Sequence, residues 1–314
     1  MKQPDIYDSD NRLILENCTV CPRECRINRF EGGTGYCGIS AGFNIASICI
    51  HRGEEPVISG RNGICNIFFS GCNLHCIYCQ NHEISQNNSL VPDSAMDLSV
   101  VLDKISGILS DDISAVGFVS PSHVVPQVKE IIKGLNSMGL RPVTVYNTNS
   151  YDKAETIRSL SGLIDVYLPD YKYVTPALAF EFSDAHDYPE VALRAIKEMY
   201  YQKGSVLRTD KNGRAENGML IRHLVLPGHA EESKKVLLSI AEELSPGVHL
   251  SLMSQYHPAH RVMNIPDLNR SLYREEYESV VEYMNSLGFR NGYVQEMESH
   301  ISYRPDFRRE HPFE

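Results

Sequence analysis

Three cysteines stand at a spacing that suits metal chemistry. Cys72, Cys76 and Cys79 form a C-x3-C-x2-C loop directly after the hydrophobic run 66–69. Gly71 lets the backbone turn close to an inorganic group without a Cβ clash. Thiolates at this spacing can hold one iron–sulfur cubane. Because the loop supplies only three ligands, one iron would keep an open position, and a metal with an open position does chemistry.

A zinc knot is the alternative interpretation of this loop, with His75 or Cys65 as the fourth ligand. His75 stands between two of the cysteines, where it would point away from a shared metal. The strand would have to bend to bring Cys65 back. These two requirements favour an iron–sulfur cluster over zinc.

A second group of cysteines precedes the first. Cys18, Cys21, Cys25 and Cys37 follow the spacing C-x2-C-x3-C-x11-C on glycine-rich loops. Four thiolates suffice for a closed site, and both zinc and an auxiliary [4Fe–4S] cluster fit them. The remaining alternative is four thiols without a metal, but this segment has little else to hold it together. A closed site would be structural or an electron relay.

Composition and charge limit the class of protein. The chain has 314 residues, 42% of them hydrophobic and 22% charged, with a net charge of −10. This acidity disfavours a nucleic-acid partner. Residues 1–17 lack a secretory pattern, and no apolar run has the ~20 residues of a membrane span. We therefore expect a cytoplasmic protein with no membrane partner. None of the nine cysteines follows Cys79, and such clustering in a reducing compartment indicates metal or redox chemistry.

The texture of the sequence changes at Cys65. Before it, residues 1–60 are loop-rich, and we expect a Cys-rich metal-binding segment there. After it, β-rich runs alternate with helical patterns, which predicts a parallel α/β barrel, partial or open, over 61–314. Active groups in such folds lie at the carboxyl ends of the strands. The expected strands are 66–69, 115–119, 142–146, 164–168, 219–226, 248–253 and 292–295, and the expected helices lie near 95–109, 123–138, 153–160, 190–201, 231–244 and 274–287.

The cluster loop carries a family resemblance. GCNLHCIYCQN, with an aromatic residue before its last cysteine, resembles the signature of the radical S-adenosylmethionine (SAM) superfamily, and more closely the loop of glycyl-radical-enzyme activating enzymes. The nearest resemblance is to pyruvate formate-lyase activating enzyme-related (PflX-type) proteins, over essentially the whole chain. It implies a partial (β/α)6 TIM-like radical SAM barrel. Four further motifs occur in the expected order, namely NTNSY at 147–151, PDYK at 169–172, IRHLVLPG at 221–228 and QYH at 255–257.

The resemblance implies a reaction. In the family, the amino and carboxylate groups of SAM chelate the open iron of the [4Fe–4S] cluster. An electron, supplied by a donor such as flavodoxin or ferredoxin, cleaves the sulfonium C–S bond and gives methionine and a 5′-deoxyadenosyl radical. That radical abstracts hydrogen from an unactivated C–H bond. The protein orients the cofactor and shields the radical.

Charged residues at later strand ends could bind SAM. Its carboxylate needs a cation, which Lys172 or Arg222 could supply. Asp170 could hold that lysine or a ribose hydroxyl. Without the resemblance, an Asp-x-Lys pair is more often a surface ion pair, and Arg222 could be structural.

Other SAM-site residues follow from the resemblance alone. Tyr78 corresponds to the position that meets the adenine, and His257 to a histidine that lines the SAM pocket. Asn147 replaces an aspartate that many activases carry. The Gly-Gly-Glu-type segment that receives the SAM amine is replaced here by FVSPSHV at 118–124, where backbone oxygens or the hydroxyls of Ser120 and Ser122 could accept instead.

Three functions remain open. The first is an activating enzyme that installs a glycyl radical on a partner protein. The second is a radical SAM enzyme acting on another small-molecule or peptide substrate, which the altered segment at 118–124 and the extra cysteine site favour. The first two functions carry equal weight. The third and most distant is a zinc-binding structural or interaction protein.

Overall fold

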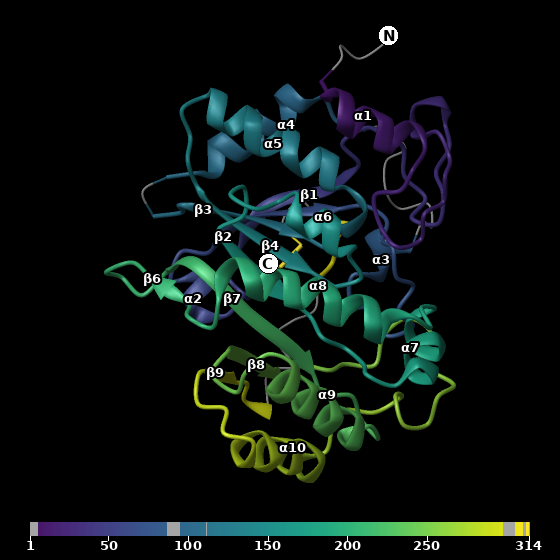
Figure 1. The fold of residues 1–314 in the computed structure, drawn as a ribbon, viewed down its shortest axis with the longest axis vertical. Helices are drawn as coiled ribbons and strands as arrows, with labels where there is room; N and C mark the ends of the chain where they lie inside the picture. Colours follow the sequence, from purple (N-terminus) through teal and green to yellow (C-terminus); the bar gives the residue numbers. More distant parts are fainter. Residues whose placement is uncertain (1–5, 87–94, 111, 298–304, 310–311, 314) are drawn as a thin grey trace.

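The centre of the molecule is one largely parallel sheet, shown in the computed structural model of Figure 1. The structure describes residues 6–86, 95–110, 112–297, 305–309 and 312–313. Strand order is β1-β2-β3-β4-β5-β7-β8-β9; β1 is antiparallel to β2, the strands from β2 to β9 along this path are parallel, and β6 is antiparallel to β7. The bounds are β1 Ile45–His51, β2 Ile64–Phe69, β3 Ala115–Val119, β4 Val143–Thr148, β5 Val166–Pro169, β6 Arg208–Thr209, β7 Ala215–Leu224, β8 His249–Met253 and β9 Gly292–Val294.

Helices connect successive parallel strands and cover the outside of the sheet (Figure 1). Among the described residues no pairing joins β9 back to β1, so the sheet is an open arc and not a closed barrel. The predicted α/β fold with an open parallel barrel is confirmed. The helices are α1 Ser9–Glu16, α2 Pro56–Ser59, α3 His82–Ser85, α4 Leu98–Ile108, α5 Val125–Ser137, α6 Ala154–Arg158, α7 Pro176–Ser183, α8 Tyr188–Lys203, α9 Ala230–Glu243 and α10 Arg274–Ser286, with short 3₁₀ turns η1 Arg29–Glu31 and η2 Pro121–His123.

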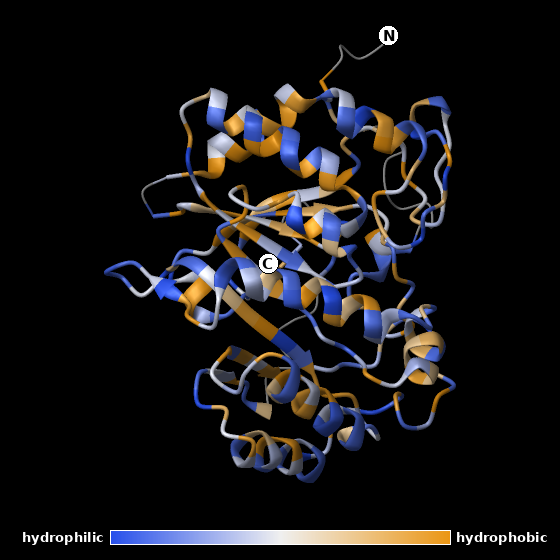
Figure 2. Ribbon diagram, viewed as in Figure 1, coloured by the Kyte–Doolittle hydropathy of each residue, from blue (hydrophilic) through white to orange (hydrophobic). Residues whose placement is uncertain are grey.

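Apolar side chains account for this layering. Every residue of β2 is buried, as expected for a strand with neighbours on both faces. Helix α8 buries Val191, Ala195, Ile196 and Met199 along one face, the stripe that its sequence predicts. In Figure 2 the hydrophobic colour accordingly concentrates in the strands, while the helices are banded.

The sequence predicts most elements but not all. Each expected strand and helix is present, with its ends shifted by a few residues. The N-terminal strand β1 was not predicted. Its sequence, IASICIH, has no simple alternation of apolar and polar residues, and its burial pattern in the structure has none either. Helix α7 was also missed; Pro176 at its first position begins it, and Asp184 in a left-handed conformation ends it.

The first 60 residues contribute to the sheet through β1, which pairs with β2. The other described residues of this segment form α1, η1, α2 and loops, and those before β1 are the purple segment of Figure 1. Residues 1–5 of the predicted Cys-rich segment lie outside the described residues. A domain boundary near residue 60 therefore stays a prediction, and it would fall between two paired strands.

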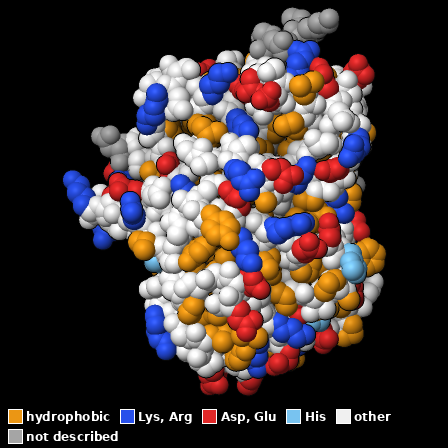
Figure 3. Space-filling model, in the orientation of Figure 1, with side chains coloured by type: hydrophobic (Ala, Val, Ile, Leu, Met, Phe, Trp, Pro, Cys, Tyr) orange, Lys and Arg blue, Asp and Glu red, His pale blue; other side chains and the backbone are white. Residues whose placement is uncertain are grey.

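The described helices include none with the length and apolar character that crossing a bilayer requires. On the face of the molecule in Figure 3, basic and acidic side chains are interspersed and do not form separate patches.

Gly117 in β3 provides a test of the sheet's packing. A Cβ at this position would lie 2.0 Å from Oδ1 of Asn66, a buried side chain of β2. We expect Gly117→Ala to lower the melting temperature, because overpacking a close-packed core costs about 1–3 kcal/mol. Gly107→Ala in α4 is the matched control: nothing lies within 4 Å of its Cβ, and we expect a neutral or raised melting temperature. Equal effects of the two substitutions would contradict this packing.

Candidate functional site

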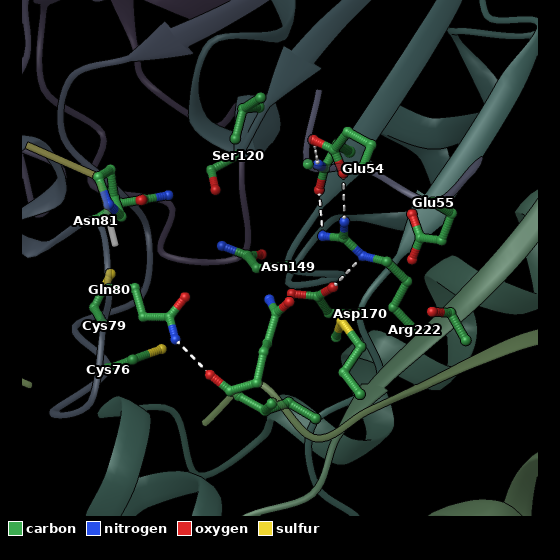
Figure 4. A pocket seen from close by; sticks show the side chains of 18 of the residues that line it. Glu54, Glu55, Cys76, Cys79, Gln80, Asn81, Ser120, Asn149, Asp170 and Arg222 are labelled. Atoms are coloured by element: carbon green, nitrogen blue, oxygen red, sulfur yellow. Dashed lines mark hydrogen bonds and ion pairs between the residues drawn. The ribbon is translucent and has the colours of Figure 1, made fainter. Parts of the chain in front are cut away.

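A cavity of about 460 Å³ opens at the carboxyl ends of the parallel strands. This size is typical of small-molecule and cofactor sites. Its wall receives residues from the ends of β2, β3, β4, β5, β7, β8 and β9, as expected for an α/β barrel. Part of the lining is drawn in Figure 4.

The three-cysteine loop forms one wall of this cavity. Cys72, Cys76 and Cys79 all line it, and Figure 4 shows the last two side by side beneath Asn81. Gly71, with φ +72°, turns the chain out of β2, and its N–H donates to the carbonyl of Ile84. The loop is therefore fixed by backbone hydrogen bonds on the side away from the cavity.

Polar hydrogens surround the sulfurs. Asn149 Nδ2 and the N–H of Leu74 each lie 3.4 Å from Cys72 Sγ. Ser183 Oγ donates to Cys76 Sγ at 3.0 Å, and Ser85 Oγ lies 3.2 Å from Cys79 Sγ. Hydrogen bonds to thiolate sulfur stabilise its negative charge and tune metal centres.

Burial opposes ionisation of these thiols in the absence of a metal. It raises the pKa of Cys72 to about 12 and that of Cys79 to about 11, with the neighbouring Cys76 adding to both shifts. Metal binding needs the thiolate and displaces the proton. The donors around the sulfurs are therefore placed to stabilise the thiolates that would form when a metal binds.

A cubane fits this donor set better than a single ion. Among the described residues, no three His, Cys, Asp or Glu side chains are grouped so as to hold one metal ion. A [4Fe–4S] cluster does not require such a group, because each thiolate binds a different iron. The three loop cysteines would hold three irons and leave the fourth toward the cavity.

Opposite the loop lies a network of charges. Asp170, just after β5, accepts from Lys172 Nζ at 2.8 Å and from Arg222 Nε at 2.9 Å. Burial alone would raise the pKa of Asp170, but Arg222 and then Lys172 outweigh it and hold the pKa below its usual value. For Lys172, burial would lower the pKa, and Asp170 and Cys76 raise it above its ordinary value. Both partners are therefore ionised at neutral pH.

Arg222 donates hydrogen bonds to three side chains, so its guanidinium is already paired and is not free to bind the carboxylate of SAM. Besides Asp170, its Nη1 donates to Glu54 Oε2 at 3.1 Å and its Nη2 to Asn147 Oδ1 at 2.6 Å (Figure 4). Asn147 in turn donates to Glu54 Oε1 at 3.1 Å. Lys172 donates to one acceptor among the described residues, so two of its three ammonium hydrogens remain for a ligand.

Glu54 and Glu55 are site residues that the sequence analysis missed. They follow β1, which runs antiparallel to β2, so they enter from the amino-terminal side of the parallel strands and form the floor of the cavity. Burial, with Glu54 adjacent, raises the pKa of Glu55 and so favours its protonated form, and its Oε2 has no hydrogen-bond partner among the described residues. No motif marks this pair, because their position depends on how β1 pairs.

The remaining predicted positions differ in outcome. Tyr78 lines the cavity and shares a hydrogen bond with the hydroxyl of Tyr173. Ser120 also lines it, in a left-handed conformation (φ +51°), whereas Ser122 is turned into the core against Thr148. His257 is not among the lining residues, although Gln255 of the same motif is.

The four N-terminal cysteines gather outside this cavity. The described structure places none of them in its lining. The thiol of Cys37 interacts electrostatically with those of Cys18 and Cys25, and that of Cys21 with those of Cys37 and Cys18. The four thiols therefore lie near one another, and a shared metal site stays a prediction.

Comparisons with known proteins identify no activity for this chain. No protein-family model matches the chain. The uncharacterized protein MJ0674 of Methanocaldococcus jannaschii is 29% identical over 277 residues, which cover 86% of this chain and 74% of that protein.

Three solved structures are similar in fold, each at 14% sequence identity. A domain of pyruvate-formate lyase-activating enzyme from Bacteroides vulgatus has a TM-score of 0.38, covering 55% of this chain and 93% of that one. Streptococcus suis SuiB, bound to its precursor peptide SuiA, has a TM-score of 0.48 over 74% of this chain and 48% of its own. The same protein bound to S-adenosylmethionine also scores 0.48, over 74% of this chain and 50% of its own. At these TM-scores the likenesses carry no argument, and the function rests on the site.

The Arg222 network yields a stability prediction. We expect Arg222→Met to lower the melting temperature by roughly 5 °C or more, because removing one partner of a buried ion pair costs about 3–5 kcal/mol. Arg158→Met is the control, since the Arg158 side chain is 67% exposed where it pairs with Glu198, and such pairs contribute about 1 kcal/mol or less. Thermal denaturation of both variants checks this, and equal shifts would exclude a buried role for Arg222.

Proposed function

We propose that this protein is a radical SAM enzyme, with Cys72, Cys76 and Cys79 holding a [4Fe–4S] cluster on the wall of the 460 Å³ cavity. Held by these three cysteines, the cluster would supply the electron that cleaves the C5′–S bond of SAM to methionine and a 5′-deoxyadenosyl radical, which would take a hydrogen atom from the substrate. A one-electron donor such as flavodoxin or ferredoxin supplies the electron. The protein binds, orients and shields these groups.

One observation carries the proposal. Each of the three loop sulfurs faces the cavity and has a polar partner within 3.0–3.4 Å, while a lysine with spare donors lies in the same cavity. A structural zinc site would fill its coordination shell and would not need an adjoining charged cavity.

The chain's own residues would orient SAM. Lys172, held by Asp170, would pair with the carboxylate of SAM, and Tyr78 would contact its adenine. Arg222 would hold Asp170, Asn147 and Glu54 in place through its three hydrogen bonds, and would not contact SAM itself. The carbonyls and hydroxyl near Ser120 would receive the SAM amine.

Anaerobic reconstitution tests the proposal. We expect protein loaded with iron and sulfide, then reduced with dithionite, to give a [4Fe–4S]⁺ EPR signal that SAM perturbs, together with 5′-deoxyadenosine release. Well-loaded protein that shows neither would exclude the proposal.

The matched variants separate the loop from the other cysteines. The triple variant C72A/C76A/C79A should lose both the SAM-sensitive signal and 5′-deoxyadenosine. Cys65→Ala, a buried cysteine of β2 outside the loop, should retain both. Lys172→Met should retain the cluster signal but require roughly tenfold or more SAM to perturb it, since a charge-assisted contact contributes about 1.5–3 kcal/mol. SAM titration followed by EPR measures this, and an unchanged titration would remove Lys172 from the SAM site.

Two classes of substrate are compatible with this chemistry. The series of motifs from 147 to 257 supports an enzyme that installs a glycyl radical on a partner protein. The altered segment at 118–124 supports another peptide or small-molecule substrate. Incubation with a glycyl radical enzyme precursor from the same genome decides: a glycyl radical EPR doublet that requires this protein and SAM supports the first, and 5′-deoxyadenosine without that doublet supports the second.

A further inference from the structure

The N-terminal cysteine cluster surrounds a buried arginine. Arg29, at the start of η1, is 2% exposed, while Cys18 and Cys37 are each 2% exposed. Arg29 Nε donates to Cys18 Sγ at 3.1 Å and Nη2 donates to Cys37 Sγ at 3.3 Å. The N–H of Tyr36 donates to Cys25 Sγ at 3.3 Å. Three of the four sulfurs thus act as acceptors for nitrogen donors.

The charge of Arg29 requires an anion. A guanidinium remains protonated in proteins, and burying it without a partner of opposite charge is costly. Its described hydrogen bonds go to the two sulfurs and to the carbonyl of His123, at 2.9 Å, and to no carboxylate. Neutral thiols would not compensate this charge, whereas metal-bound thiolates at the same two sulfurs would.

We propose that Cys18, Cys21, Cys25 and Cys37 hold an anionic metal–thiolate centre, and that Arg29 is its charge partner. Because no three described side chains are grouped around one metal ion, a cluster fits the quartet better than a single ion. Four thiolates with a [4Fe–4S]²⁺ core give a net charge of −2, and Arg29 reduces this to −1. Its N–H groups donate to the ligating sulfurs, as hydrogen bonds around metal–thiolate centres do. This centre is independent of SAM cleavage at the other loop.

The centre also supports the first cluster loop. His123, whose carbonyl accepts from Arg29, places its own Nε2 2.9 Å from the carbonyl of Ser70, two residues before Cys72. Arg23, between two of the four cysteines, donates to the carbonyl of Asn73 at 2.9 Å. Tyr36 stacks on His75 with ring centroids 4.1 Å apart. Metal binding in the N-terminal segment therefore fixes a surface that packs against the loop of Cys72.

Metal analysis of a variant that lacks the first site tests the proposal. In the full-length triple variant C72A/C76A/C79A, we expect the quartet to retain about four irons with inorganic sulfide, and a visible charge-transfer band, after anaerobic reconstitution and desalting. Zinc retained in place of iron would contradict the cluster. If adding Cys18→Ala and Cys37→Ala does not reduce the retained metal, the quartet holds none and the proposal is wrong.

The role of Arg29 has its own test in the same background. We expect Arg29→Leu to weaken metal retention against a competing chelator by roughly 10–100-fold, the range for partners of metal ligands. Arg29→Lys, which keeps the charge, should lose less. Arg26→Gln is the matched control, because Arg26 lies on the same segment with its side chain 66% exposed and paired with Glu24. With iron, removal of the positive charge should also shift the reduction potential to more negative values.

Two outcomes would contradict the role of Arg29. One is an Arg29→Leu protein that retains metal as Arg26→Gln does. The other, decisive if Arg29→Leu does not fold by circular dichroism, is an Arg29→Lys protein that loses metal as completely as C18A/C37A. Both are measured in the C72A/C76A/C79A background, whereas the EPR and 5′-deoxyadenosine readouts use protein with all three loop cysteines, so failure here is distinguishable from failure of the proposed SAM chemistry.

Discussion

The cavity depends on one buried charge, the guanidinium of Arg222. Its planar group reaches Asp170 after β5, Asn147 in β4 and Glu54 beyond β1, so it joins three separate parts of the chain. A guanidinium suits this place because its donors lie in fixed directions and it stays charged when buried. Its hydrogen bonds hold the floor of the cavity against the strand ends. They also determine that Lys172, and not Arg222, keeps donors for a ligand.

The sulfurs of both cysteine groups accept hydrogen bonds from nearby donors. In each, nitrogen or hydroxyl donors are directed at thiol sulfurs in a buried setting, which is unfavourable for neutral thiols and favourable for metal-bound thiolates. The two groups differ in what else surrounds them. The loop of Cys72 opens onto a cavity, whereas the N-terminal quartet encloses Arg29. The loop of Cys72 could therefore admit a ligand from the cavity, whereas a site at the quartet would be closed.

Local sequence predicts the parts of the site that local structure fixes. The strand 66–69, the cysteine loop after it and the charged residues 170, 172 and 222 at strand ends all follow from β/α rhythm and spacing. Glu54, Glu55 and Arg29 could not be predicted in this way. The two glutamates reach the cavity only because β1 pairs antiparallel to β2, and Arg29 resembles any arginine of a polar loop until the chain folds around it. His257 shows a second limit of the sequence. A motif predicts where this histidine occurs along the chain, but not whether its side chain lines the cavity.

The N-terminal segment packs against the loop of Cys72 and is not an appendage. Arg23 and Tyr36 contact the loop between Cys72 and Cys76 directly, and Arg29 reaches Ser70 through His123. Tyr7, Leu15, Val20, Ile39 and Phe43 are buried in the main hydrophobic core, so apolar packing holds this segment to the sheet. A metal bound by the four cysteines would add a cross-link to that packing. The position of the loop of Cys72 would then depend on both, because Arg23 and Tyr36 pack against that loop.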